Sequence, residues 1–411
     1  MKCISGIVQR GVRAALVSVA LVVGIAGVAQ EASAQRGMMG QFDIGTSPVS
    51  KRSLEEYAKM LGMDDTQKEA ATDLLTGYRE QLKTARESRD SKIESIMEEA
   101  KDSGDWMGMQ KKLQGEGMKF RDEFKKLEEG FSSDIKALLT PKQMEKWGDV
   151  ERHRRRDLHL RFQFYSGGAV DVVSVLSRTG TGLDTPEFKD LLSQYETAMD
   201  TQLRDWEARA KSIEDDMKKD ADNGGMQGPM KAMEELGAVS KQVRDINKDF
   251  SGRVMAMLSD EQKAKFETMF NERAFPRVYK KVYVQEKLEA AAKLDGLDTQ
   301  QKETVSQLQD QWTKESKPLN ASWTQAIVAE EDESGGMFGS MMKRFGQQEG
   351  DKKGANVKEA REARKALEDR ISKRLDEVLS PQQKEKLPKK KPGSMDMFGD
   401  MFGAGPDDED E

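Results

Sequence analysis

Apolar residues recur every three or four positions along most of the chain, and this spacing predicts long amphipathic helices. The clearest run steps without a break through Phe188, Leu191, Tyr195, Met199, Leu203, Trp206, Ala210, Ile213 and Met217. A run of the same period returns through Met233, Leu236, Val239, Val243, Ile246, Phe250, Val254 and Met257. Two such runs predict one helical hairpin with arms roughly 50 Å long.

Similar pairs of apolar runs precede and follow this hairpin. The earlier pair contains Leu75, Tyr78, Leu82, Ile93 and Ile96, then Phe120, Phe124, Leu127, Phe131, Ile135 and Leu138. The later pair contains Val305, Leu308, Trp312, Leu319, Trp323 and Ile327, then Ala360, Ala363, Leu367, Ile371, Leu375 and Val378. Segments rich in glycine, methionine and acidic residues interrupt the three pairs at Lys101–Gly108, Lys218–Pro229 and Glu330–Asn356, which predicts hairpin tips.

A five-residue motif marks the ends of these runs. It has Leu or Met, then Thr, Ser or Asp, then two residues and Gln or Glu, and it begins at Met63, Leu139, Leu183, Leu258, Leu297 and Leu379. Its second copies lie 119 and 121 residues apart, measured from Gln143 to Gln262 to Gln383. The chain therefore contains a tandem repeat of about 120 residues.

Helix capping explains the motif without a ligand. The side-chain oxygen of a capping residue accepts a hydrogen bond from an unpaired backbone N–H, and the Gln or Glu three residues later bonds the cap's own N–H. The predicted cap and partner pairs are Asp64 with Gln67, Thr140 with Gln143, Asp184 with Glu187, Ser259 with Gln262, Asp298 with Gln301, and Ser380 with Gln383. Each copy therefore predicts a helix start.

Composition agrees with helices and not with sheets. Charged residues make up 34% of the chain and aromatic residues only 6%. We predict an all-α fold of three tandem long hairpins, resembling coiled coils, with connecting helices such as 143–163 and 262–293. The predicted divisions are a signal peptide (1–34), a flexible leader (35–50), helical repeats 51–165, 166–276 and 277–386, and a disordered tail rich in Met, Gly and acidic residues (387–411).

The first 34 residues have the composition of a secretory signal. A basic segment precedes an apolar run from Ala14 to Ala29, and Ala32-Ser33-Ala34 follows. We expect cleavage after Ala34, export to the periplasm or beyond, and no transmembrane segment in the mature chain, because this run is shorter than the roughly 20 residues that span a bilayer. A retained signal anchor is the alternative.

Removal of this segment also removes the only cysteine, Cys3, together with three basic residues and one acidic residue. The mature chain would then have no thiol, and its net charge would change from −7 to −9. This balance argues against nucleic acid as the main partner.

The residues at this point resemble a known family, the LTxxQ-motif periplasmic proteins of the Spy and CpxP type. Leu139-Thr140-Pro141-Lys142-Gln143 matches that motif fully, whereas the copies at Leu258 and Leu379 have Ser for Thr. The resemblance implies a helical cradle that binds partly unfolded or envelope proteins, as an ATP-independent chaperone or as a modulator of the envelope stress response. Three fused units replace the single unit of that family, which forms dimers.

Candidate chemistry is sparse, and we expect neither an enzyme nor a cofactor. His153 and His159 are six residues apart, so they do not share a helix face for one metal and are predicted to lie on the surface. The one candidate binding surface is a basic patch with aromatic neighbours, where acidic or partly unfolded clients would dock. Its residues are Arg152, Arg154, Arg155, Arg156, Arg161, Phe162 and Phe164. A solvated helix end is the alternative interpretation.

Two further hypotheses remain open. The apolar stripes could be consumed by self-packing or by homo-oligomer formation, which would make the chain a structural scaffold of the cell envelope. Methionines near glycine could bind copper(I) through their thioethers, they could offer adaptable apolar surface, or they could lie in plainly disordered segments. These methionines are Met38, Met39, Met107, Met109, Met337, Met341, Met342, Met395, Met397 and Met401.

Overall fold

The computed structural model describes residues 47–160, 163–219, 227–337, 339 and 355–389. Every regular element within these ranges is a helix, which confirms the predicted all-α class. No helix in the same ranges is both long and apolar enough to cross a membrane. The predicted signal peptide lies outside the described residues.

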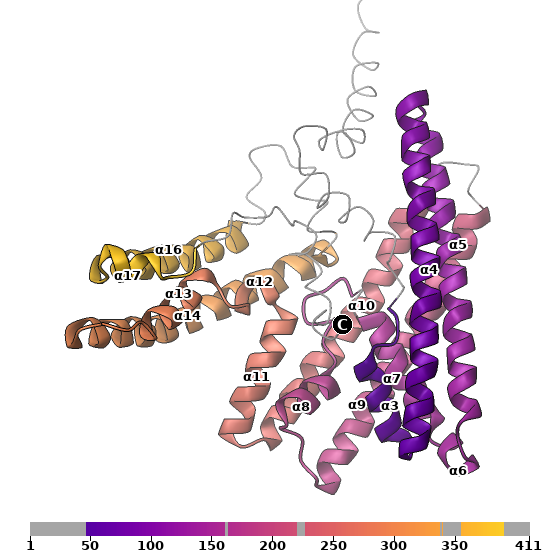
Figure 1. Cartoon of the computed structure of the whole chain (residues 1–411), viewed down its shortest axis with the longest axis horizontal. Coiled ribbons are helices and arrows are strands. Elements are labelled where there is room, and N and C mark those ends of the chain that lie inside the picture. Colours follow the sequence, from indigo (N-terminus) through magenta and orange to yellow (C-terminus); the bar gives the residue numbers. More distant parts are fainter. Residues whose placement is uncertain (1–46, 161–162, 220–226, 338, 340–354, 390–411) are drawn as a thin grey trace, which may run out of the picture. The chain divides into compact units, whose positions relative to one another are not determined.

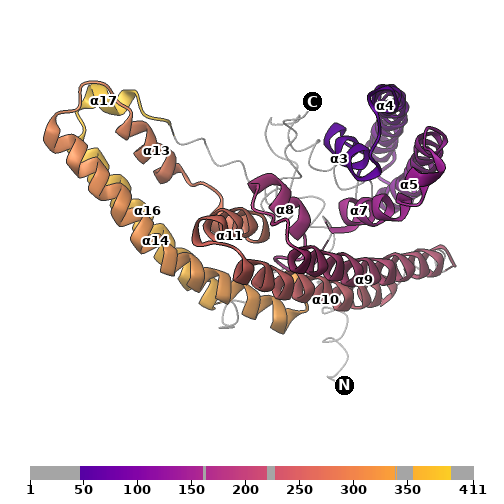
Figure 2. The ribbon, with the colours of Figure 1, turned by 90° about the horizontal axis from the view of Figure 1, so that it is seen from below.

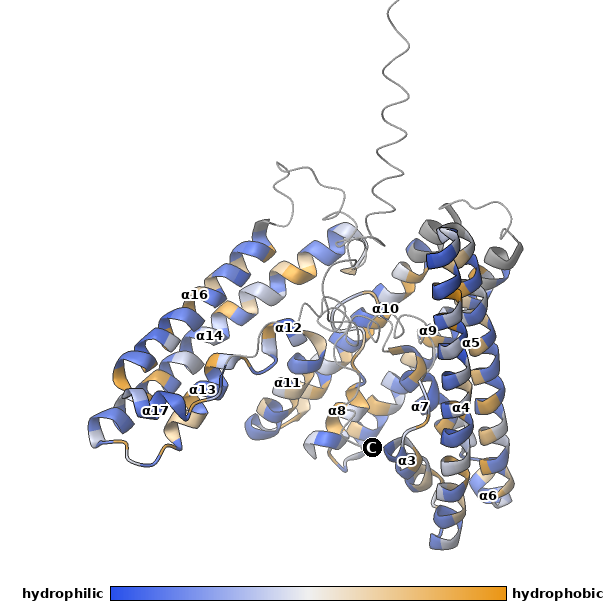
Figure 3. Ribbon diagram, turned by 45° about the horizontal axis from the view of Figure 1, so that its top comes forward, coloured by the Kyte–Doolittle hydropathy of each residue, from blue (hydrophilic) through white to orange (hydrophobic). Residues whose placement is uncertain are grey.

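Three pairs of long helices dominate the fold (Figures 1 and 2). The pairs are α4 (Asp65–Ser103) with α5 (Trp106–Ala137), α9 (Pro186–Lys219) with α10 (Gln227–Met257), and α14 (Thr299–Ser334) with α16 (Ala355–Val378). The first hairpin turns through Gly104 and Asp105, inside the predicted tip. Figure 3 shows hydrophobic residues at intervals along these helices among more numerous hydrophilic ones.

Each pair buries the apolar stripe that its sequence predicts, and each has its own core. Tyr78 of α4 packs against Phe131 of α5 with ring centroids 5.0 Å apart. In the second pair Tyr195 meets Phe250 edge to face at 5.5 Å. The third core contains Leu308, among other residues of α14 and α16. A two-helix layer buries only one stripe of each arm, so these cores are narrow.

A short helix precedes each hairpin. The sequence did not predict the one before the second hairpin, whereas the third lies within the predicted helix 262–293. These helices are α3 (Lys51–Leu61), α8 (Val172–Thr179) and α13 (Tyr283–Ala292). Each is followed within a few residues by a glycine with positive φ, namely Gly62 (66°), Gly180 (61°) or Gly296 (80°). Helix α8 lies between α7 and the start of the second hairpin. The three short helices pack near the bases of their hairpins, α3 on α4, α8 on α10, and α13 on both α14 and α16.

The connecting segments are divided more finely than predicted. The predicted helix 143–163 is α6 (Pro141–Met144) and α7 (Trp147–His159), and the predicted helix 262–293 is α11 (Asp260–Ala274), α12 (Pro276–Tyr279) and α13. Pro276 explains one break, because proline disfavours helical geometry at the preceding residue. Phe275 accordingly has φ −137° and ψ 62°. The last described helix is α17 (Pro381–Glu385).

Two predicted boundaries need correction. Val49, assigned to a flexible leader, is buried in the first core. Leu387, assigned to a disordered tail, is buried in the third core, and the hydroxyl of Tyr283 donates to the carbonyl of Pro388 at 2.9 Å. Buried apolar residues therefore lie on both sides of the segment in which the sequence shows a helical period. Residues 35–46 and 390–411 lie outside the described residues.

Candidate functional site: the arginine run and the hairpin bases

The arginine run occupies α7, and its consecutive side chains point in different directions. Successive residues of an α-helix project about 100° apart, so three arginines in sequence cannot form one surface. Arg154 pairs with Glu128 of α5 at 2.7 Å, and Glu128 also accepts a hydrogen bond from the hydroxyl of Tyr78. Arg154 therefore binds α7 to the first hairpin.

Arg155 turns toward the second hairpin. Its guanidinium pairs with Asp200 and, at 3.0 Å, with Glu207 of α9. His159 lies 2.8 Å from the other oxygen of Glu207 through its Nε2. Two side chains from successive turns of α7 thus meet one carboxylate of α9.

Arg156 is almost fully enclosed, with 2% of its side chain exposed. It pairs with Asp171 at 3.1 Å and with Glu196 of α9 at 3.2 Å. Burial is the largest single influence and would raise the pKa of the Asp171 carboxyl, but the nearby positive charge and the hydrogen bonds from Arg156 and Val173 together outweigh it, so the pKa is lowered. Asp171 also caps α8, because its Oδ1 accepts from the backbone N–H of Val173 at 3.0 Å.

The predicted basic patch is therefore wrong as an exposed surface. Arg154, Arg155 and Arg156 are largely buried in ion pairs, and only Arg152, which pairs with Asp149, is more than a third exposed. Arg161 and Phe162 lie outside the described residues. The alternative of a solvated helix end is wrong as well, because the arginines join α7 to α5, α8 and α9.

Phe164 takes part in the same junction through both its ring and its backbone. Its ring meets Trp206 of α9 edge to face at 5.5 Å. Its N–H donates to Ser240 Oγ of α10 at 3.1 Å, and its carbonyl accepts from the N–H of Met337 at 2.6 Å. Phe164 thus connects the segment after α7 with the second hairpin and with the end of α14.

The histidines are not the surface residues that the sequence suggested. His153 is buried, and its Nε2 lies 3.1 Å from Glu56 and 3.6 Å from Asp157. It also meets Tyr57 of α3 edge to face at 5.7 Å. The spacing argument against a shared metal still applies, since the two imidazoles face different helices. Within the described ranges, no group of three or more potential His, Cys, Asp or Glu ligands is arranged to hold a metal ion.

The sequence contains a signal for the acidic partners that was missed. Glu196, Asp200 and Glu207 are four and seven residues apart, which places them on one face of α9. An acidic stripe at helical spacing, matched to a nearby arginine run, would have suggested pairing between the two helices.

The bases of the first and third hairpins are closed by pairs of glutamines. Gln67 and Gln143 each accept the N–H of their own capping residue, Asp64 or Thr140, through Oε1. Their amide nitrogens lie 2.9 Å from each other's Oε1, so the two side chains exchange hydrogen bonds. We call such a reciprocal pair of capping glutamines an amide clasp.

The amide groups of the clasp also bind the ends of the neighbouring helices. Gln67 Nε2 donates to the carbonyl of Leu138 at 2.7 Å, and Gln143 Nε2 donates to the carbonyl of Gly62 at 3.0 Å. In the third hairpin Gln301 and Gln383 form the same clasp at 3.1 Å, with donation to Val378 and Gly296. Only an amide can accept from its own capping residue and also donate to the partner glutamine and a helix-end carbonyl, which gives Gln a role that the Glu carboxylate cannot perform.

The second hairpin departs from this arrangement, and one predicted cap is wrong. Thr185, not Asp184, caps α9, because its Oγ1 accepts from the N–H of Phe188 at 3.3 Å. Pro186 is then the first helical residue, where its missing N–H costs nothing. Asp184 instead pairs with Lys189 at 2.5 Å. At the start of α11, which follows the return helix α10, Ser259 and Gln262 form the predicted box.

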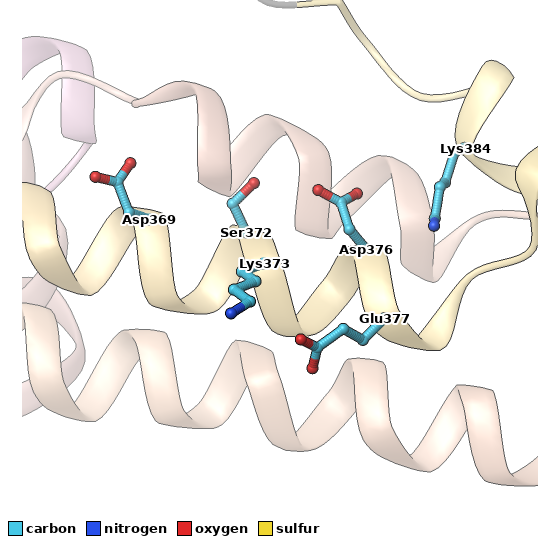
Figure 4. Close-up of a pocket in the computed structure, with 6 residues that line it drawn as sticks. All are labelled: Asp369, Ser372, Lys373, Asp376, Glu377 and Lys384. Carbon is cyan, nitrogen blue, oxygen red and sulfur yellow. The ribbon is translucent and has the colours of Figure 1, made fainter.

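A shallow groove of about 550 Å³ runs beside α16 and α17 (Figure 4). The side chains of Asp369, Ser372 and Asp376 project from the same side of α16, and Lys384 approaches from α17. Lys287 of α13 donates to both oxygens of Asp376, at 2.7 and 2.8 Å. Carboxylate and ammonium groups alternate along the groove, as is typical of solvated helix faces.

The described tip methionines are not open thioether surfaces. Met109 is buried near the first hairpin tip, and Met337 is half-buried where its backbone meets Phe164. Of the other methionines in the copper hypothesis, the side chain of Met107 and all of Met38, Met39, Met341, Met342, Met395, Met397 and Met401 lie outside what the structure describes.

Comparisons with known proteins add no relative: no protein-family model, no characterised protein and no solved structure matches the chain significantly.

Proposed function

We propose that the chain is an exported, non-enzymatic helical protein that holds partly unfolded proteins without ATP, in the manner of the LTxxQ-motif proteins it resembles. The amide clasps support this proposal, because they explain why the motif occurs in pairs. The Gln of one copy forms hydrogen bonds with the Gln of a second copy. A clasp joins the outward arm to the end of the return arm at the hairpin base. The opposite end of the hairpin is then free to present side chains to a client.

The observation that carries a client surface lies at the tip of the first hairpin. Trp106 opens α5 with 51% of its surface exposed, the most exposed large apolar residue in the described ranges. A groove of about 390 Å³ lies between the same distal parts of α4 and α5, beside Ile96. Tryptophan is enriched among the residues that contribute most of the binding energy at protein interfaces.

The groove also offers positive charge. Lys92, Lys112 and Lys119 line it, and each is more than half exposed although it pairs with Glu116 or Glu99. A partly unfolded segment with apolar and acidic residues would contact Trp106 and Ile96 through its apolar groups. Its carboxylates would replace Glu99 or Glu116 as partners of the lysines. Exposed ion pairs are weak, so such exchange is energetically accessible.

The test is suppression of aggregation of an unfolded model protein by residues 35–411, at near-stoichiometric ratio and without ATP. We expect suppression by the unmodified chain and at least a threefold higher concentration requirement for Trp106→Ser. Met257→Ser is the matched control, since it removes another exposed apolar side chain, on α10. Equal activity of the two variants would exclude the tip as the client surface.

A second function, a structural scaffold, is favoured by a different observation. The apolar stripes of the three hairpins are buried within their own pairs, and the exposed large apolar residues in the described ranges are Trp106, Met144 and Met257. Light scattering distinguishes the two functions. A stable homo-oligomer without aggregation suppression would support the scaffold, and a monomer that suppresses aggregation would contradict it.

A further inference from the structure

The end of α14 reaches the junction loop, which we define as the described residues 163–171 between α7 and α8. Arg364 of α16 donates to Asn320 of α14 at 2.7 Å, which sets the register of the third hairpin. Helix α14 continues past Asn320 to Ser334, and its last turn contacts the junction loop and α10.

Glu331 forms the main contact of this last turn. The N–H of Ser166 donates to its Oε2 at 2.9 Å, and the Ser166 hydroxyl donates to its Oε1 at 2.7 Å. The adjacent residue, Asp332, pairs with Arg244 at 2.9 Å and with Lys241 at 3.3 Å, both on α10. Ser166 and α10 are thus both bound by successive residues of α14.

The chain leaves α14 in close contact with the same loop. Gly336 has φ 98°, and a Cβ there would lie 2.7 Å from the carbonyl oxygen of Phe164. The next residue, Met337, donates its N–H to that carbonyl at 2.6 Å. A side chain at position 336 would push the two segments apart, so close approach requires glycine here.

The Glu331 carboxyl is buried, with 3% of the residue exposed, and it lies among several charged groups. Arg244 faces it from α10 and Arg277 from α12, while Tyr165, Lys241 and Asp332 complete the surroundings. Arg244 is engaged with Asp332 and Asp245. Burial therefore prevails over the Ser166 hydrogen bonds and the arginines, and it raises the pKa of Glu331 to about 7.

We propose that these contacts form a latch between the third hairpin and the junction loop, and that ionisation of Glu331 weakens the latch. The protonated carboxyl can remain buried against Ser166 at little cost. The carboxylate loses hydration there that Ser166 only partly replaces. Opening of the latch would expose Glu331 to water and release the end of α14 from Phe164 and Arg244.

The direction of the pH effect follows from proton binding. The closed latch holds the Glu331 proton up to about pH 7, whereas the open form releases it near the ordinary value of about 4.5. The closed form therefore binds more protons between these limits, and the latch weakens as pH rises through this window. From about pH 5 to about pH 8 the opening equilibrium should shift roughly 70-fold toward the open form.

Hydrogen exchange on the mature chain tests the latch. The amides of Ser166 and Met337 are protected only when it is closed, because they donate to Glu331 and Phe164. After correction for intrinsic rates, their protection should fall by tens of fold over this pH range. Glu331→Gln should keep the protection nearly constant. Glu333→Gln, an exposed carboxylate on the same turn, is the matched control and should follow the unmodified chain.

A second measurement keeps the test informative if Glu331→Gln folds poorly. Spin labels on Ala169→Cys and Glu333→Cys lie on exposed residues of the two joined segments. Their distance distribution should broaden as the pH rises and narrow again when the pH is lowered. Protection and label distances that stay constant with pH in the unmodified sequence around Glu331 would overturn the proposal.

Discussion

The bases of the first and second hairpins show how one sequence motif can have two structural outcomes. At the first base, Gln67 and Gln143 cap their own helices and bind each other through the amide clasp. At the second base, Glu187 stands in the place of the first glutamine, and Thr185 caps the helix one residue later than the motif predicts. Helix initiation is a local property that survives at both bases, whereas the clasp needs two amides.

The second hairpin has a different connection, a buried polar network. Asn247 of α10 is fully buried, and its Oδ1 accepts from the hydroxyl of Tyr195 of α9 at 3.0 Å. Its Nδ2 donates to the carbonyls of Gly167 and Gly168 at 2.9 and 3.1 Å. A side chain from the interior of this hairpin thus binds the junction loop. In the first hairpin, by contrast, the clasp joins the two arms at the base.

The largest effect expected from this comparison is that of Asn247→Ala. It leaves the Tyr195 hydroxyl and two glycine carbonyls without their partner in a buried site, which should cost about 3 kcal/mol of unfolding free energy. Urea unfolding followed by circular dichroism measures the loss. Asn271→Ala, a half-buried asparagine on α11, is the control and should cost far less. Equal losses would mean that the network does not join the hairpin to the loop.

An intermediate effect is expected when a carboxylate replaces one of the two clasp amides, because the second base also has one Glu and one Gln. Gln143→Glu keeps the acceptor for Thr140 but removes the donor to Gly62 and Gln67, which should cost about 1 to 2 kcal/mol. Gln262→Glu makes the same change where the glutamine bonds its own cap, Ser259, and should cost less than about 0.5 kcal/mol. Comparable urea midpoints for the two variants would contradict the clasp.

The smallest effect separates the two candidate caps of α9. Thr185→Ala removes the acceptor for the N–H of Phe188 and should lower stability by about 1 kcal/mol. Asp184→Ala should leave the urea midpoint unchanged, because Asp184 is exposed and pairs only with the adjacent turn at Lys189. A loss confined to Asp184→Ala would restore the cap predicted from the motif.

Much of the fold was predictable because its determinants are close together in the sequence. A capping hydrogen bond spans three residues, and five of the six predicted boxes have both of their hydrogen bonds. The apolar stripes of α4, α9 and α14 are long enough for their period to be visible. Helix α8 was missed because eight residues contain too few turns to show the same period.

The candidate site was harder to predict because its partners are distant in the sequence. The run Arg154 to Arg156 looks like an exposed basic patch until α5 and α9 supply the carboxylates that bury it. Trp106 gave no signal of its own, since exposure at a hairpin tip depends on where the neighbouring arm ends.

The sequence by itself determined the helical class, the long arms and most of their starting points, since helical period and capping act within a few residues. Tertiary structure decided which glutamines form clasps, where the arginines lie and why Glu331 is buried. These properties depend on residues 15 to 165 positions apart, such as Arg156 with Asp171 or Ser166 with Glu331, which meet only after the hairpins pack.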